Sequence, residues 1–92
     1  MQDAFSRMEL LVGNTGVKKL SRAKIAVFGL GGAGSQVAES LARCGVGSLT
    51  LIDHEKITLT NIGSQVLALH STLGMSKEEA AKKRIRDIDE NI

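Results

Sequence analysis

The chain has 92 residues and a formal net charge of +2, and 42% of its residues are hydrophobic and 24% charged. These values are typical of one small globular domain and exclude a disordered chain. The mild charge argues against a nucleic-acid-binding surface, and with Phe5 and Phe28 as the only aromatic residues the chain lacks the stacking platforms of single-strand binders.

Hydropathy and cysteine content exclude further classes. No apolar run approaches the ~18 residues that cross a membrane, and no signal-peptide pattern opens the chain, so we expect a cytoplasmic protein without a membrane partner. Cys44 is the only cysteine, which excludes an internal disulfide and a cysteine metal cluster. Its place on an apolar helix stripe predicts a buried structural thiol rather than a nucleophile.

Residues 1–23 form an N-terminal helical arm. Apolar residues at helical spacing predict a helix over residues 3–12, which Gly13 and Asn14 end. A short second helical segment over residues 17–21 leads to the first strand. Arg7 lies on the polar side of the first helix, where a solvated charge is the default interpretation.

Residues 24–53 follow the order strand, glycine loop, helix, strand and acid. The apolar run 25–28 predicts a buried strand, and the loop 29–34 that follows it, GLGGAG, fits G-x-G-x-x-G. A helical pattern begins at Ser35 and stops at Gly45, and a second apolar run, 49–52, ends on Asp53. A glycine-rich turn alone can be only a tight connection between a strand and a helix. Here the strand, glycine loop, helix, second strand and acid occur in sequence, which favours a nucleotide-binding βαβ unit.

Each part of this unit has a physical reason. Gly29 allows a turn closed to other residues, Gly31 lets a phosphate approach the backbone, and Gly34 lets the helix pack close to the strand. The N-terminus of the helix offers free N–H groups and a positive dipole end to that phosphate. Asp53 lies 19 residues after Gly34, where a carboxylate can accept hydrogen bonds from ribose hydroxyls.

The polar loop after Asp53 follows the carboxyl end of a strand, where ligands of parallel sheets bind. Glu55 and Asn61 are therefore candidate site residues. His54 and His70 have no partner at ligand spacing and are interpreted as solvated loop residues. A short helix is predicted over residues 65–70.

The last predicted helix opens with a capping box, Ser76-x-x-Glu79. It has an apolar stripe of Ala81, Ile85, Ile88 and Ile92, and its charged face is interpreted as solvated. Lys77 differs from the other charges, because a cation in the first turn opposes the helix dipole unless an anion is near. Two parallel strands cannot make a stable sheet alone, so we expect the N-terminal segment of a longer protein, or a chain that completes its sheet with a partner.

Several separated motifs resemble the ThiF/MoeB/HesA family of ubiquitin-activating-type adenylating enzymes. They are the run GLGGAGSQVAESLARCGVGSLTLIDHEKITLTNIGSQ and the later GMSK. The opening FSRMELLVGNTGVKKLSRAKIAVFG and the later ALHS are most similar to its tRNA threonylcarbamoyladenosine dehydratase branch. The resemblance spans nearly all of residues 1–92, but only the first part of such a protein.

The resemblance implies an α/β fold with a Rossmann-like sheet, preceded by an N-terminal helix, that binds ATP with Mg²⁺ rather than NAD. Family members activate a carboxylate as its acyl-adenylate and release pyrophosphate. In the dehydratase branch the carboxylate belongs to a modified adenosine of tRNA, which cyclises with net loss of water. The resemblance also implies a homodimer, and in some relatives a sulfur-carrier or ubiquitin-like partner.

The resemblance also assigns roles to individual residues. The residues that match the nucleotide site are Gly29, Gly31, Gly32 and Gly34 beneath the phosphates, Asp53 at the ribose, Glu55 as the second acid of D-x-D/E, and Asn61 and Gln65 of N-x-x-R-Q. Lys77 matches the lysine that reaches the phosphates, and Arg7 matches an arginine that crosses a dimer interface to the partner's ATP.

Two departures from the family pattern affect activity. Ser64 replaces the arginine of N-x-x-R-Q, and the aspartate that holds magnesium in relatives lies beyond Ile92. We therefore interpret residues 1–92 as the ATP-binding segment of an adenylating enzyme, with residues 24–92 as the nucleotide-binding unit, and expect no adenylation by this segment alone. An NAD-dependent oxidoreductase fragment and a non-catalytic nucleotide-binding or assembly module are the alternatives.

Overall fold

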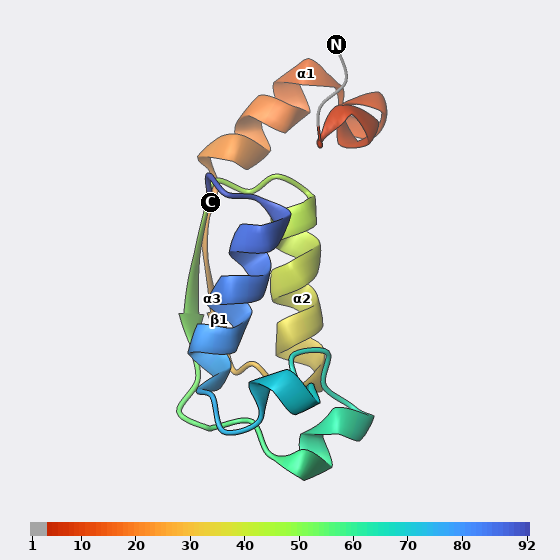
Figure 1. Cartoon of the computed structure of the whole chain (residues 1–92). Helices are drawn as coiled ribbons and strands as arrows, with labels where there is room; N and C mark the ends of the chain where they lie inside the picture. Colours follow the sequence, from red (N-terminus) through yellow and green to blue (C-terminus); the bar gives the residue numbers. More distant parts are fainter. Residues whose placement is uncertain (1–3) are drawn as a thin grey trace.

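The computed structural model describes residues 4–92, which fold as an α/β unit (Figure 1). The elements in chain order are α1 (Ser6–Arg22), β1 (Lys24–Phe28), α2 (Gly32–Arg43), β2 (Ser48–Ile52), the 3₁₀ helices η1 (Leu59–Gly63) and η2 (His70–Thr72), and α3 (Lys77–Ile88). The predicted order of strand, glycine loop, helix and strand is confirmed.

The two strands pair in parallel, from Lys24 opposite Ser48 to Phe28 opposite Ile52. α2 connects them, and α2 and α3 lie side by side over one face of the sheet (Figure 1). β1 was predicted to be buried, but its residues alternate, with Val27 7% and Phe28 76% exposed. This differs from the prediction because, within residues 4–92, both packed helices cover the same face. The predicted incomplete parallel sheet is confirmed.

The core lies between the covered face of the sheet and the two helices. Small residues let α2 and α3 approach closely, since Ala38, Ala42 and Ala81 are at most 1% exposed. The other core residues are Val27, Leu30, Ile57, Leu67, Ala68, Ala80 and Ile85. The predicted stripe is confirmed on α3 for Ala81, Ile85 and Ile88, whereas Ile92 packs against the core from beyond the end of the helix at Ile88.

α1 bends at Gly13, whose φ is 74°, so the predicted end of a first helix at this glycine is confirmed. The helix begins at Ser6, and the predicted start at Asp3 lies outside the described residues. The second segment runs to Arg22, one residue beyond its predicted end. Leu10 and Leu11 are 87% and 81% exposed, although Leu11 is one of the apolar residues at helical spacing that predict this helix.

Three local predictions are wrong. α2 begins at Gly32, inside the glycine loop, rather than at Ser35. Residues 65–70 do not form a helix, because the Thr72 hydroxyl donates to the Leu67 carbonyl at 2.6 Å and accepts from the Leu69 N–H at 2.9 Å, which favours a turn. Cys44 caps the C-terminus of α2 and is only partly buried.

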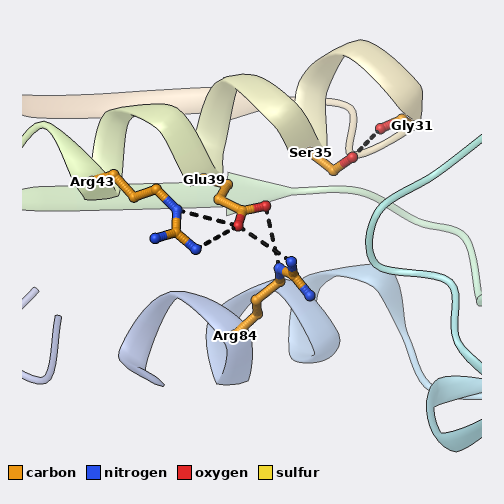
Figure 2. Close-up of polar contacts among 5 residues, drawn as sticks. All are labelled: Gly31, Ser35, Glu39, Arg43 and Arg84. Carbon is orange, nitrogen blue, oxygen red and sulfur yellow. Dashed lines mark hydrogen bonds and ion pairs between the residues drawn. The ribbon is translucent and has the colours of Figure 1, made fainter. Parts of the chain in front are cut away.

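Charged residues join the two packed helices (Figure 2). Glu39 of α2 pairs with Arg84 of α3 at 3.2 Å and with Arg43, one turn further along α2, at 2.9 Å. The Glu39 side chain is 13% exposed, so Arg84 belongs to the helix contact. The prediction that the whole charged face of α3 is solvated is therefore wrong at this position.

Candidate functional site

The glycine loop turns the chain from β1 into α2. Gly29 has φ 87°, a backbone conformation that favours glycine, and its N–H donates to the Ile52 carbonyl at 2.8 Å. A Cβ on Gly34 would lie 1.7 Å from the Gly29 carbonyl oxygen, so only glycine fits there. A Cβ on Gly31 would meet only the Gln65 side chain, at 4.0 Å. The loop is thus tight where α2 meets β1 and open where a ligand can approach the backbone.

Ser35 fixes the start of α2. Its hydroxyl donates to the Gly31 carbonyl at 2.6 Å, and the residue is 2% exposed (Figure 2). The sequence prediction missed this residue. A serine four residues after the loop's central glycine, able to bond the carbonyl one turn back, is the signal that points to it.

Asp53 links the two strand ends. Its Oδ2 accepts the Leu30 N–H, and its Oδ1 accepts the Glu55 N–H, both at 2.7 Å. Partial burial raises the pKa of Asp53, but these two amides and the positive charges of Lys77 and His54 outweigh it, and the net pKa is lowered. The carboxylate is therefore ionised at neutral pH, and each oxygen keeps a further lone pair for a hydroxyl donor.

The first turn of α3 lies against the loop that follows Asp53. Ser76 caps the helix, accepting the Glu79 N–H at 3.1 Å, which confirms one of the two bonds of the predicted capping box. The Lys77 N–H donates to the Glu55 carbonyl at 3.0 Å, and Glu78 Oε1 accepts the Asp53 N–H at 2.8 Å. Sequence analysis missed Glu78. An acid in a first helical turn suits the dipole, but its partner lies 25 residues away and has no sequence signal.

Lys77 is 3% exposed, the most buried charged residue in the described part of the chain. No carboxylate of residues 4–92 lies within 4.0 Å of its ammonium, although its charge lowers the pKa of Asp53. Burying an ammonium group costs free energy unless an anion compensates it. Lys77 therefore places a positive charge near Asp53 without a direct ion pair, and an anionic ligand could bind it.

Residues 61–65 lie over the glycine loop. The Gln65 Nε2 is the atom nearest to the open side of Gly31, and a Cβ on Gly32 would lie 3.3 Å from the Ser64 carbonyl oxygen. Asn61 Oδ1 accepts the Thr58 N–H at 2.9 Å and so caps η1. Glu55 contributes its backbone groups, while its side chain is exposed.

A hollow of about 290 Å³ opens at the carboxyl ends of both strands. The residues that line it are Phe28, Gly29, Ile52, Asp53, His54 and Glu55. Arg7 lies outside this cluster. It is exposed on α1, which precedes β1 and so lies at the end of the strand opposite to the glycine loop (Figure 1).

The described residues have neither a group of three metal-ligating side chains nor a helix that is long and apolar enough for a membrane. The site described above contains backbone amides, the Lys77 side chain and the Asp53 carboxylate, groups of the kind that bind a nucleoside phosphate. His54 and His70 are exposed, as predicted.

Comparisons with known proteins show the family of the chain. The sequence model of the ThiF family matches residues 5–92. The tRNA threonylcarbamoyladenosine dehydratase of Bacillus subtilis is 45% identical over 89 residues, which are 97% of this chain and 35% of that protein. The MOCS3 adenylyltransferase and sulfurtransferase of Xenopus laevis is 38% identical, over 96% of this chain and 20% of its own length.

A solved structure has the same fold. The Escherichia coli tRNA N6-threonylcarbamoyladenosine dehydratase in complex with ATP gives a TM-score of 0.94 at 39% identity, covering 96% of this chain and 36% of that one. The chain spans about a third of the length of the curated dehydratases that it matches. These relatives do not favour the NAD-dependent alternative.

Proposed function

The chain belongs to the ThiF family, and from this premise we propose that it is the ATP-binding part of an enzyme that activates a carboxylate by adenylation. The observation that carries the proposal is the convergence of three elements on one end of the sheet. α2 brings the glycine loop, β2 brings Asp53, and α3 brings the buried Lys77.

Each element binds a different part of ATP in this proposal. Asp53 accepts from the ribose hydroxyls, and the amides at the N-terminus of α2 face the phosphates. Gly29, Gly31, Gly32 and Gly34 allow that approach. Lys77 neutralises phosphate charge, and Asn61 and Gln65 offer amide groups beside the loop. Glu55 holds the start of α3 through its carbonyl.

Mg²⁺ enters this proposal only with ATP, where it would neutralise charge on the phosphates. The described residues hold no group of three metal-ligating side chains. We propose its protein ligand only from the resemblance to the family, whose magnesium-binding aspartate has no counterpart in residues 1–92. The Asp53 carboxylate is already an acceptor of two amides, which suits a hydroxyl contact better than a metal.

We infer that the carboxylate belongs to threonylcarbamoyladenosine in tRNA. The support is the dehydratase activity for which the Bacillus subtilis and Escherichia coli relatives are named. In the reaction, a carboxylate oxygen attacks the α-phosphorus, pyrophosphate leaves, and cyclisation of the acyl-adenylate releases AMP. The net change in the nucleoside is loss of one water. A sulfur-carrier or ubiquitin-like partner, suggested by the MOCS3 relative, is the second hypothesis.

We also propose a homodimer in which Arg7 reaches the partner's ATP. Arg7 is exposed on α1 and is far from the glycine loop in sequence. It therefore does not contribute to the nucleotide site of its own chain. An arginine at a symmetric interface can donate to a phosphate of the neighbouring site.

Calorimetric titration with ATP and with NAD, at equal magnesium, tests the proposal. We expect ATP to bind and NAD to bind at least about tenfold more weakly, a difference of about 1.4 kcal/mol. NAD binding without ATP binding would overturn adenylation. Binding of neither nucleotide would contradict ATP binding by this chain.

A further inference from the structure

We propose that Glu78 is a positioning residue, which holds the Asp53 carboxylate where a nucleotide needs it. The inference rests on the proposed function, because Asp53 is the ribose acceptor there. The contact is a hydrogen bond between Glu78 Oε1 and the Asp53 N–H, at 2.8 Å in a partly buried place. Glu78 touches the backbone of Asp53 and acts through it.

The first turn of α3 holds the segment 53–55 at both of its ends. Glu78 accepts from the N–H of residue 53 through its side chain, and the Lys77 N–H donates to the carbonyl of residue 55 at 3.0 Å. The turn that carries the buried cation is thus tied to the acid on β2. Movement of either one would change the distance between them.

The Asp53 carboxylate depends on this backbone placement. Its two oxygens accept N–H groups from the glycine loop and from the loop after β2, at Leu30 and Glu55. Both bonds are 2.7 Å long, which is short for an N–H donor and leaves little freedom to the acceptor. If the Asp53 N–H lost its acceptor, residue 53 could turn towards water, and both carboxylate bonds would lengthen.

A carboxylate near an anionic ligand costs electrostatic free energy unless another interaction compensates its charge. Glu78 lies in the first turn of α3, at the positive end of the helix dipole, and its Oε1 accepts the Asp53 N–H at 2.8 Å. The role we assign needs only the acceptor atom, so Glu78→Gln should keep it. Glu79 is the matched control, because it has the same charge in the same turn but an exposed side chain.

The first experiment uses the 92-residue chain without nucleotide and measures amide hydrogen exchange at Leu30 and Glu55. Neither amide touches Glu78, so a merely local effect would not change them. We expect Glu78→Ala to speed both about tenfold, as loss of a charge-assisted bond would, while Glu78→Gln and Glu79→Ala stay near wild type. Unchanged exchange in Glu78→Ala overturns the inference, as does an equal acceleration in Glu78→Gln.

The second experiment titrates the same variants with ATP and with 2′,3′-dideoxy-ATP. We expect Glu78→Ala to bind ATP roughly tenfold more weakly and to lose most of the preference for ATP over the dideoxy analogue. Glu78→Gln should retain both. If wild type binds no ATP, the proposed function fails, and the exchange data still decide whether Glu78 positions Asp53. Normal ATP binding by Glu78→Ala overturns the link to the nucleotide. If Glu78→Ala does not fold, Glu78→Asp replaces it, with the acceptor one methylene shorter.

Discussion

Lys77 is expected to lower the stability of the free chain and to strengthen the binding of ATP. Lys77 is 3% exposed and its ammonium has no ion pair among residues 4–92, so we expect its burial to cost stability in the free protein, whereas in the proposed complex it binds a phosphate. We expect Lys77→Met to raise the melting temperature of the free chain and to weaken ATP binding by about one to two decades. Thermal unfolding and calorimetry measure the two effects.

Lys82→Met is the control for this prediction, because Lys82 lies on the same helix with an exposed side chain. It should change neither quantity appreciably. A lower melting temperature for Lys77→Met, with unchanged ATP binding, would show that the lysine is a structural residue.

Ser64 stands where the family motif N-x-x-R-Q, by the resemblance, places an arginine, and it is exposed in the turn that follows η1. Its carbonyl faces Gly32, so the residue lies beside the glycine loop. An arginine there could donate charge-assisted bonds worth about 1.5–3 kcal/mol each. We expect Ser64→Arg to tighten ATP binding roughly tenfold or more, with an effect that shrinks as salt is raised.

The structural alternative for Ser64 is that Gly63 changes the shape of the loop, so that the side chain of residue 64 points away from the site. Unchanged affinity in Ser64→Arg, with a clear loss in Lys77→Met, would favour that alternative. Ser71→Arg is a control for added charge, since Ser71 is also exposed but lies in η2.

At the scale of elements, the glycine loop and both strands were predictable because their signals are local. Glycine spacing, apolar runs and one acid lie within thirty residues of sequence. Residues 59–72 were not, since η1 depends on the Asn61 side chain and η2 on the Thr72 hydroxyl, contacts that have no strong pattern in the sequence. The same holds for the site. The glycine loop and Asp53 were predictable from local sequence, whereas Glu78 was not, because its hydrogen-bond partner lies 25 residues away.

The contact between α2 and α3 holds together the helices that carry the glycine loop and Lys77. Burial raises the pKa of Glu39, but hydrogen bonds from Arg43 and Arg84 and then their charges lower it more, for a net decrease from 4.5. We expect a double-mutant cycle of Glu39→Gln and Arg84→Met to give a coupling of about 0.5–1 kcal/mol at neutral pH. Denaturant unfolding measures it.

The pH dependence of this coupling has a definite sign. Because the folded-state pKa of Glu39 is depressed, its stabilisation is complete above the unfolded value of about 4.5 and disappears as the pH falls through the lower folded value. The control cycle uses Arg43, which is 61% exposed and lies on the same helix as Glu39, and should give about 0.3–0.5 kcal/mol. A larger coupling to Arg43 than to Arg84 would contradict the helix-joining role.

At the scale of the whole molecule, the described chain leaves apolar surface uncovered in two places. One is the face of the sheet that carries Phe28, opposite to α2 and α3. The other is the first segment of α1, where Leu10 and Leu11 are almost fully exposed. Exposed apolar patches of this kind recruit a partner, and a two-stranded sheet is marginal alone.

We therefore expect the chain to self-associate at micromolar concentration. Leu10→Asp with Leu11→Asp should shift it to monomer, because each charge would be buried in an apolar interface. Leu59→Asp is the matched control, since Leu59 is 65% exposed but lies on η1, near the proposed nucleotide site rather than on the arm. Sedimentation velocity across a concentration series separates these cases. If Arg7 serves the partner's ATP, Arg7→Ala weakens ATP binding in the dimer and has no effect in the Leu10→Asp/Leu11→Asp monomer. A wild type that sediments as a monomer at every concentration would remove both the dimer and the role of Arg7.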